Sequence, residues 1–479
     1  MRPPTAAGLA SAPGDDTVRD RERPSAAPLL RARALPAWPF AGLFVLYPVW
    51  WLLGITPVIL PLLGAVCLFL MALRGSIRLP PLWWLWTGFV IWMTASAVMV
   101  DTPGRMIGFA QRLGAVIGAT LLVVYVYNAR ERLPRRRALA AMATFGIWLV
   151  IGGYLGMLLP YERITTPAMM LTPPTLASNE YVVELLSPRF AEVQHPYGAT
   201  SDFVRPSAPF PYTNAWGHTF VLLLPVVLAL AVRSTRRVRL LLTVGVILAV
   251  PPALATLNRG IFVGIGVGAA YLTLRYLRRI SLVRILQIAL ALAVLGVGVF
   301  ASGALDRVTE RTSTSSTTQD RASLYQEAFH RTLESPWLGW GAPRPSATLE
   351  VSVGTQGHFW YLMFSHGFVG LALYVGTVWG LGLITARYTR RLVDHESMLM
   401  HTVIVLIGVT LLFYGVDGLH LVIALSCAAL VVRPELNGPT NRTLRASARL
   451  HSAVPAPHTL LGNPSGEKGE VDGHRRAQQ

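Results

Sequence analysis

The sequence predicts an all-α polytopic membrane protein. Of its 479 residues, 53% are apolar and only 14% are charged, and the mean hydropathy is +0.47, a composition outside the range of soluble domains. Apolar runs close to the ~20 residues that cross a bilayer recur along the chain, separated by short polar clusters. Two much longer polar segments interrupt this pattern, and we expect them to fold outside the membrane.

Apolar runs and their breakers predict about twelve transmembrane helices. Gly54 and Pro57 divide the first apolar stretch, which is too long for one span, into two helices. The predicted helices cover residues 40–53, 57–73, 82–100, 107–127, 138–159, 216–232, 240–257, 260–274, 285–301, 359–386, 398–414 and 418–432.

Arginine clusters in the short loops predict the orientation. If successive helices cross the membrane in alternating directions, all the arginine clusters fall on the same side. The positive-inside rule assigns this side to the cytoplasm. The net charge of +18 therefore indicates topology, and we predict no nucleic-acid partner. Both termini are then cytoplasmic, and the two long polar segments, about 160–215 and 302–357, are extracytoplasmic. The clusters lie at residues 74–78, 129–137, 233–239, 275–279 and 387–391.

The composition divides the chain into three parts. Residues 1–38 and 434–479 are predicted to be disordered cytoplasmic tails, and residues 39–433 to form one transmembrane domain. The two long extracytoplasmic segments contain too many aromatic residues for plain disorder, so we expect them to fold as caps over a site. Within the second one, residues 319–334 have the pattern of a helix.

Arg259 stands between two apolar runs, in the stretch ATLNRGIFVGIGVG. The predicted topology puts it at the outer end of a tight helical hairpin whose first arm is interrupted by Pro251 and Pro252. One interpretation is an arginine that reaches up to lipid headgroups. The other is an anion ligand, because a guanidinium group binds phosphate oxygens through two parallel N–H bonds. Arg259 alone does not distinguish the two.

Other polar residues on the predicted outer face favour the anion ligand. Arg205, Asn214 and Arg321 lie there, and carboxylates are few. Such a face suits a multiply charged anion, and a lipid-linked diphosphate is the natural candidate in a membrane protein. For Arg205 and Asn214, a salt bridge or hydrogen bond that stabilises a loop is the plainer alternative.

His358 lies where the second long segment meets a helix, close to the proposed anion site. A neutral imidazole at this place can accept a proton from an attacking sugar hydroxyl. A capping or interfacial role is the alternative, and we expect His366, further along the helix, to be packed in the interior. Walker loops, metal-ligating His/Cys clusters and nucleophile elbows are missing from the sequence, so we predict no cofactor and no metal.

Four pieces of the chain, in this order, resemble the O-antigen ligase and Wzy-type polysaccharide polymerase superfamily over about residues 206–383. They are RPSAPFPYTN, LNRGIFVGIGVG, DRASLYQEAFHRTLESPWLGWG and GTQGHFWYLMFSHGFVGLALYV. The resemblance implies a GT-C-like fold. It also implies metal-independent, inverting transfer of a polyprenyl-diphosphate-linked glycan to a glycan or lipid acceptor outside the cytoplasmic membrane.

The resemblance also implies roles for individual residues. Arg259 and Arg321 would bind the donor diphosphate and stabilise it as the leaving group. A histidine at the start of the following helix would deprotonate the acceptor hydroxyl. Counting back from Gly367 places this position at Gln356, whereas a short insertion in the loop would place it at His358, so both are candidates.

Two other functions remain open at this point. A flippase or transporter for a lipid-linked glycan would bind the same diphosphate without catalysis, and it would carry charged residues deep in its helices. Arg112 and Asp417 are the candidates for such residues. A non-catalytic subunit of an envelope assembly complex would need none of the site residues for activity.

Overall fold

The computed structural model describes residues 34–194, 202–276, 317–349, 351–391, 394–416 and 418–433. It is mostly helical, and six of the described helices are long and apolar enough to cross a membrane, with three shorter apolar helices beside them. The chain is therefore a polytopic membrane protein. The predicted helix at 285–301, the predicted tails apart from residues 34–38, and Asp417 lie outside the described residues.

The first group of helices follows the predicted order, with one additional break. Gly54, at φ 76°, ends α2 and separates it from α3, as predicted. The predicted helix 40–53 is divided at Leu46, because the ring of Pro48 is incompatible with a continuous helix at this point. These helices are α1 (Trp38–Val45), α2 (Tyr47–Leu53), α3 (Thr56–Arg74), α4 (Trp83–Ala95) with the 3-10 turn η1 (Ser96–Met99), α5 (Pro103–Asn128) and α6 (Arg135–Leu158).

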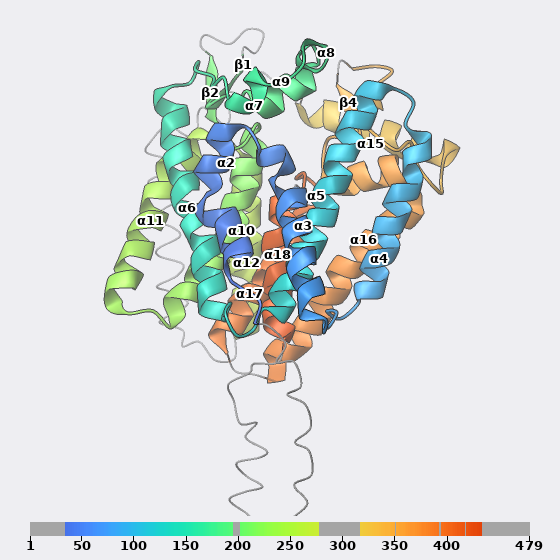
Figure 1. Cartoon of the computed structure of the whole chain (residues 1–479). Coiled ribbons are helices and arrows are strands. Elements are labelled where there is room, and N and C mark those ends of the chain that lie inside the picture. The colour runs from blue at the N-terminus through green and yellow to red at the C-terminus, as the bar shows by residue number, and fades with distance from the viewer. Residues whose placement is uncertain are drawn as a thin grey trace, which may run out of the picture. The chain divides into compact units, whose positions relative to one another are not determined.

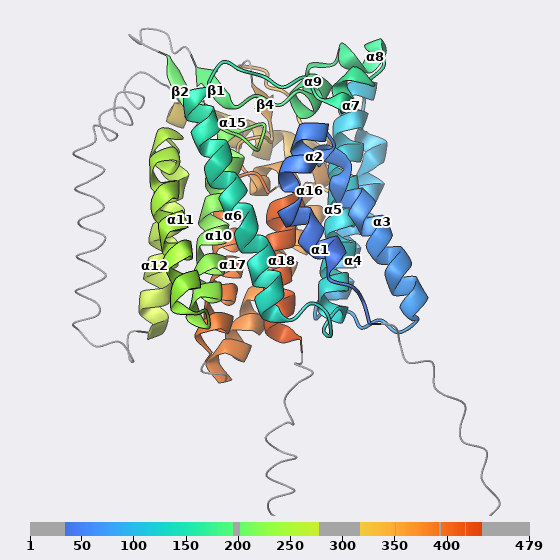
Figure 2. The ribbon, with the colours of Figure 1, turned by 60° about the vertical axis from the view of Figure 1, so that its left-hand side comes forward.

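The second group includes α18, which lies in the middle of the bundle (Figure 2) and packs against α5, α10, α16 and α17. Nearly every residue of α18 is buried. By contrast, α11 continues through Pro251 and Pro252 and buries only Ala249, Pro252 and Ala253, as expected of a helix that faces lipid. These helices are α10 (Thr213–Val232), α11 (Arg236–Ala255), α12 (Arg259–Tyr276), α16 (His358–Arg391), α17 (His395–Thr410) and α18 (Gly418–Val432).

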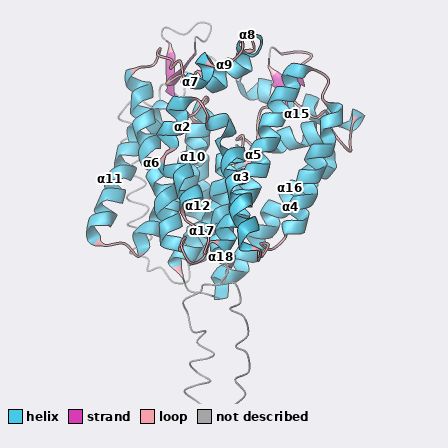
Figure 3. Ribbon diagram, in the orientation of Figure 1, coloured by secondary structure: helices cyan, strands magenta, loops and turns pink. Residues whose placement is uncertain are grey.

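The two long polar segments gather at one end of the bundle, which we call the capped end (Figures 1 and 3). The strands β1 and β2 pair antiparallel, as do β3 and β4. The predicted helix at 319–334 is present within α15. The elements of the cap are α7 (Pro167–Met170), α8 (Pro174–Ala177), α9 (Glu180–Leu186), β1 (Ala191–Gln194), β2 (Phe203–Pro206), α15 (Thr317–Glu334), β3 (Arg344–Pro345) and β4 (Ser352–Val353).

The prediction of one continuous helix over 359–386 is wrong, because α16 changes direction at Gly367. This residue has φ 67° and ψ −174°, which only glycine adopts readily. The segment before α16 fills the break: Trp340 and Gly341 donate backbone hydrogen bonds to the carbonyls of Phe364 and Ser365, at 2.9 and 2.8 Å. The kink therefore anchors the second long segment to the bundle (Figure 1).

Candidate functional site

Arg259 opens α12 at the turn that joins α11 to α12, as predicted. The side-chain oxygen of Asn258 accepts a hydrogen bond from the backbone N–H of Gly260 at 3.0 Å and caps the new helix. Both arms of this hairpin pack on α10, and in addition α11 packs on α6 and α12 on α17. Arg259 is exposed, and within the described ranges its guanidinium has no hydrogen-bonding or ionic partner. Its charge is thus available to a ligand.

Arg205 on β2 is almost fully buried, at 4% exposure, and its guanidinium is engaged within the protein. Its Nε donates to the carbonyl of Thr256 at 2.8 Å, and its Nη1 lies 3.2 Å from a carboxylate oxygen of Glu192. Burial lowers the pKa of Arg205, the Glu192 carboxylate opposes this change, and the positive charge of Arg321 lowers it further. Arg205 therefore fixes the strand pair to the end of α11, next to Arg259.

Arg321 on α15 is half-buried and lies close enough to Arg205 for the two charges to interact. Its Nε is buried and has no hydrogen-bond partner among the residues that the structure describes. Burial raises the pKa of Tyr414, while the Asn258 hydrogen bond and the charges of Arg205 and Arg321 lower it. Two arginines from distant segments thus lie close enough to Tyr414 for their charges to act on its hydroxyl.

Tyr414 lies in the turn between α17 and α18 and connects the parts of the site. Its hydroxyl donates to Asn258 Oδ1 at 2.9 Å, next to Arg259. Its carbonyl accepts the backbone N–H of His358 at 2.8 Å, so the same turn caps the start of α16. Its ring stacks on the buried ring of His218, with centroids 4.8 Å apart. Tyr414 therefore links the anion-binding turn to the candidate base.

Gln356 and His358 flank the start of α16 and have different surroundings. The side-chain amide of Gln356 donates to Thr355 Oγ1 at 3.2 Å, and the backbone carbonyl of Gln356 accepts the Tyr325 hydroxyl at 3.3 Å. The half-buried ring of His358 lies against the ring of Tyr361, with centroids 5.5 Å apart. Across the described ranges, no side chain forms a hydrogen bond with the His358 ring nitrogens. Both ring nitrogens of His358 are thus open to a substrate, whereas the Gln356 amide already has a protein partner.

Asn214 is exposed in the first turn of α10. Its neighbour Thr213 donates to the carbonyl of Arg205 at 3.1 Å, which fixes the start of α10 to β2. The described residues provide no hydrogen-bond partner for the Asn214 side chain. The structure thus places Asn214 beside the strand that carries Arg205, without a contact to Arg259 or Arg321.

Sequence reasoning missed Tyr414, Asn258 and Tyr325. Asn258 precedes Arg259 directly, and Asn is a preferred helix cap, so this residue could have been found from the sequence. Tyr414 could not, because a tyrosine at the end of an apolar run carries no signal of the contacts that it makes with residues far away in the chain.

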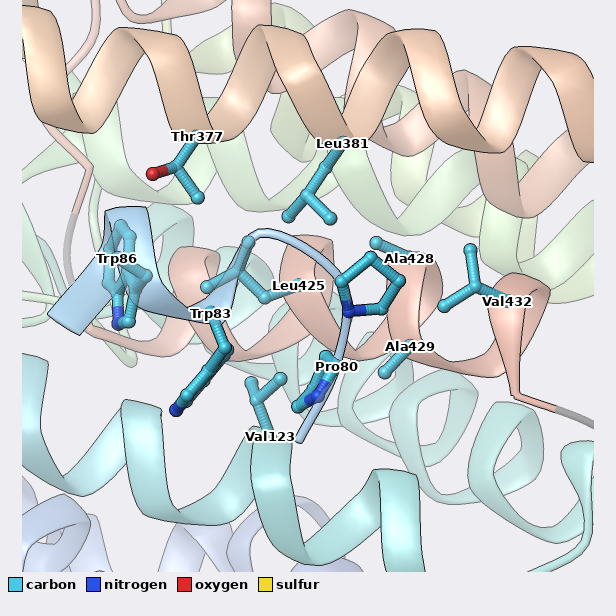
Figure 4. A pocket seen from close by; sticks show the side chains of 11 residues that line it. Pro80, Trp83, Trp86, Val123, Thr377, Leu381, Leu425, Ala428, Ala429 and Val432 are labelled. Atoms are coloured by element: carbon cyan, nitrogen blue, oxygen red, sulfur yellow. The ribbon is translucent and has the colours of Figure 1, made fainter. Parts of the chain in front are cut away.

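A small apolar pocket lies away from this site, between α4, α5, α16 and α18 (Figure 4). Its walls include Trp86, Val123, Leu381 and Ala428, and Thr377 is among the few polar residues that line it. The pocket offers no charged group to a diphosphate. The candidate site is therefore the Tyr414 region at the capped end and not this pocket.

The model of the O-antigen ligase family matches residues 252–375. The match begins near the end of α11 and contains Arg259, Arg321, Gln356 and His358, so the resemblance noted in the sequence is confirmed over this part. Tyr414 lies outside the match. No curated protein matches the chain.

Proposed function

From the O-antigen ligase domain that residues 252–375 carry, we propose that the protein is a membrane glycosyltransferase that ligates or polymerises a polyprenyl-diphosphate-linked oligosaccharide. The reaction takes place at the outer face of the cytoplasmic membrane and serves the synthesis of cell-surface polysaccharide. The observation that carries the proposal is the meeting of the Asn258–Arg259 turn, Arg321 and His358 at Tyr414.

The proposal includes the topology. The capped end faces outward, the arginine-rich loops and both termini face the cytoplasm, and the fold is of the GT-C-like type. Residues 39–433 form the transmembrane domain between two cytoplasmic tails, 1–38 and 434–479. The lipid bilayer, a lipid-linked donor and a glycan or lipid acceptor are the partners.

Arg259 and Arg321 bind the donor diphosphate in this proposal. Arg259 is exposed, and the Nε of Arg321 is buried without a partner among the described residues, so both have N–H groups left for phosphate oxygens. Charge fixed in advance at the position where a diphosphate anion leaves lowers the barrier, because no reorganisation is needed during the reaction. The guanidinium of Arg205 stays bound to Glu192 and Thr256, so Arg205 does not contact the diphosphate and attracts it only through its positive charge.

His358 acts as the general base. Its imidazole accepts the proton of the acceptor hydroxyl as that oxygen attacks the anomeric carbon of the donor sugar. The new bond joins the acceptor oxygen to the anomeric carbon, the bond from this carbon to the diphosphate oxygen breaks, and the electron pair leaves with the diphosphate. Gln356, whose amide is bound by Thr355, lies beside the acceptor and orients it.

The test compares cell-surface glycan from wild-type cells, a deletion strain and the deletion strain complemented with Arg259→Ala. We expect the deletion and Arg259→Ala to change glycan length or attachment in the same way. Arg105→Ala is the matched control, because Arg105 is an arginine at the capped end that pairs with Asp101. Wild-type surface glycan in the Arg259→Ala strain, together with no transfer by purified protein from a polyprenyl-diphosphate-glycan donor, would contradict the proposal.

The same comparison separates ligation from polymerisation. Loss of long chains in the deletion strain indicates a polymerase. Accumulation of unattached, lipid-linked long chains indicates a ligase.

The position of Arg112 supports a transferase over a flippase. Its guanidinium carbon lies 5.8 Å from the ring centroid of Tyr181, which belongs to the cap helix α9. The positive charge of Arg112 therefore faces the capped end. A transport pathway would need charged residues in the middle of the helices. A non-catalytic subunit predicts that Arg259→Ala, Arg321→Ala and His358→Ala all leave surface glycan unchanged, which the same strains test.

A further inference from the structure

A second group of polar residues lies beside His358, on α5, α9 and the first part of α16. We call Arg112, Tyr181, Tyr361 and His366 the Tyr361 cluster. The guanidinium carbon of Arg112 lies 5.3 Å from the ring centroid of Tyr361 and 5.8 Å from that of Tyr181. The Tyr361 ring meets His366 edge-on, with centroids 5.5 Å apart. The cluster thus contacts His358 through the ring of Tyr361. The site of Arg259 and Arg321 is linked to His358 through Tyr414.

The protonation of His366 follows from its hydrogen bonds. Ser96 Oγ lies 2.6 Å from the carbonyl of Met93 and 2.7 Å from His366 Nδ1. A carbonyl oxygen only accepts, so the single hydroxyl proton of Ser96 goes to Met93. His366 Nδ1 must then donate to Ser96 Oγ, which leaves Nε2 as the nitrogen with the free lone pair.

His366 Nε2 is an acceptor without a partner. The residue is 0% exposed, and Nε2 forms no hydrogen bond within the described part of the chain. A second buried polar group, the hydroxyl of Tyr374, also has no hydrogen-bond partner among the residues described, and the ring centroids of Tyr374 and His358 lie 5.0 Å apart. A buried polar atom left unpaired costs about 1–3 kcal/mol. Two of them around the candidate base indicate that a polar ligand completes this region.

The types of group in the cluster select the chemistry of the ligand. A bare imidazole nitrogen needs a hydrogen-bond donor, and a fully ionised phosphate offers only acceptors. A sugar hydroxyl provides both, because it donates to His366 Nε2 and accepts from the N–H groups of Arg112. The half-buried ring of Tyr181 supplies a flat apolar surface of the kind on which sugar rings stack.

We propose that the Tyr361 cluster is the subsite for the acceptor sugar, separate from the diphosphate site at Arg259 and Arg321. This inference rests on the proposed function and adds to it the place of the acceptor. Arg112 and Tyr181 are half-buried, so the sugar enters beside α9. Its hydroxyl then reaches His358 from the Tyr361 side, while the donor diphosphate lies on the Tyr414 side.

The test measures sugar and diphosphate binding separately on the full-length protein in nanodiscs. The sugar probes are the oligosaccharide released by mild acid from the lipid-linked glycans of the deletion strain and the glycan released from mature surface glycolipid, both followed by saturation-transfer NMR. The diphosphate probe is undecaprenyl diphosphate, followed by the shift in thermal unfolding.

Paired substitutions at one position keep the test specific. His366→Asn retains a group that can bond to Ser96 but loses the Nε2 acceptor, whereas His366→Gln places an amide oxygen near the position of Nε2. We expect His366→Asn and Arg112→Met to raise the Kd for a sugar probe at least about tenfold and to leave undecaprenyl diphosphate binding unchanged. His366→Gln should restore part of the sugar affinity.

Two control variants complete the design. Arg259→Ala should show the reverse pattern, with diphosphate binding lost and sugar binding kept. His401→Asn should leave both probes unaffected, because His401 is a buried histidine of α17 whose ring nitrogens are bonded by Thr385 and Tyr271.

The possible outcomes separate this inference from the proposed function. The inference is wrong if neither sugar probe binds the wild-type protein, or if folded His366→Asn and Arg112→Met bind the sugar as the wild type does. If both probes bind as expected but no transfer occurs, the subsite stands and the proposed glycosyltransferase activity fails.

Discussion

The hydroxyl of Tyr414 donates a hydrogen bond to Asn258 Oδ1 at 2.9 Å, and so fixes the residue that precedes Arg259. The same oxygen of Asn258 accepts the N–H of Gly260 at 3.0 Å, and a Cβ added to Gly260 would lie 2.6 Å from the Tyr414 hydroxyl. Glycine is therefore required where the backbone approaches the tyrosine. The bond makes the geometry of the diphosphate site depend on a turn between two other helices.

Tyr414→Phe should weaken diphosphate binding while the fold is kept. The substitution removes the bond to Asn258 but retains the ring that stacks on His218 and the carbonyl that caps His358. We expect a loss of about 1 kcal/mol of stability and a rise of about fivefold in the donor KM, the equivalent of ~1 kcal/mol. The measurements are thermal unfolding and the donor dependence of transfer.

Tyr125→Phe is the matched control for this prediction. The Tyr125 hydroxyl also donates to an oxygen, the carbonyl of Pro36 at 2.6 Å, but it lies on α5 far from the site. We expect a similar loss of stability without a change in donor KM. Equal donor KM values for the two variants would show that Tyr414 has no role in positioning Arg259.

Glu192→Gln should destabilise the capped end, and removal of Arg321 should partly reverse the effect. The substitution leaves Arg205 buried at 4% exposure beside the positive charge of Arg321, without its ion pair. Breaking a fully buried ion pair costs about 3–5 kcal/mol, and we expect about 2–3 kcal/mol here because Glu192 is partly exposed.

A double-mutant cycle with Arg321→Ala measures this coupling. The double variant Glu192→Gln/Arg321→Ala should be more stable than Glu192→Gln alone, because the repulsion between the two arginines is gone. Its transfer activity should nevertheless be absent, because Arg321 binds the diphosphate in our proposal. Additive effects on the free energy of unfolding would contradict the proximity of the two guanidinium groups.

The sequence predicted the helices well because hydropathy and proline or glycine breakers act locally. Gly54 and the bounds of α18 follow from such signals. The kink at Gly367 does not, since it depends on the segment before α16 inserting its backbone at this place. The charged residues of the site could be named from the sequence, which also offers a salt bridge as one interpretation of Arg205. Its partner Glu192 follows only from the pairing of β1 with β2, and the connecting role of Tyr414 depends on contacts between distant segments.

Gly367→Ala should prevent correct folding of α16. A Cβ at this position would collide with the carbonyl of Trp337 and lie 2.6 Å from that of Pro336, and the backbone has φ 67°. We expect a loss of at least about 3 kcal/mol, measured as thermal stability and as yield of monodisperse protein. His358 would be displaced, because without the kink the part of α16 before residue 367 would run in another direction.

Gly382→Ala tests whether this effect is specific to the kink. Gly382 belongs to the same helix, and its added Cβ would meet only a methyl group of Ile404 at 3.8 Å, an ordinary contact. Because alanine favours helix over glycine by about 0.5–1 kcal/mol, we expect unchanged or slightly higher stability. A comparable loss in both variants would mean that α16 tolerates no alanine for reasons unrelated to its kink.

Stability should fall in acid partly through Asp394, at the end of the bundle opposite the cap. This carboxylate caps α17, accepts the Ser397 hydroxyl at 2.8 Å and pairs with Arg135 and Arg233 at 3.3 and 3.2 Å. Burial raises its pKa, but the Ser397 hydrogen bond and the two arginines outweigh burial, so the net pKa is lowered. A carboxylate with a lowered folded-state pKa stabilises the protein above its unfolded-state pKa of about 3.9 and loses this contribution as pH falls through the folded-state pKa.

Asp394→Asn should therefore lower the stability at pH 7 by about 1–3 kcal/mol, and the difference from wild type should shrink as pH falls below about 4. Asp101→Asn is the control: Asp101 also has a lowered pKa, mainly through its hydrogen bond to Arg105, but this carboxylate is 38% exposed. Water screens such a pair, so its variant should lose less than about 1 kcal/mol. Thermal unfolding of the three proteins between pH 3 and 8 measures the difference. Only the ionised carboxylate pairs with the two arginines. A difference in stability between wild type and Asp394→Asn that stays constant across this pH range would therefore mean that these ion pairs do not hold α6, α10 and α17 together.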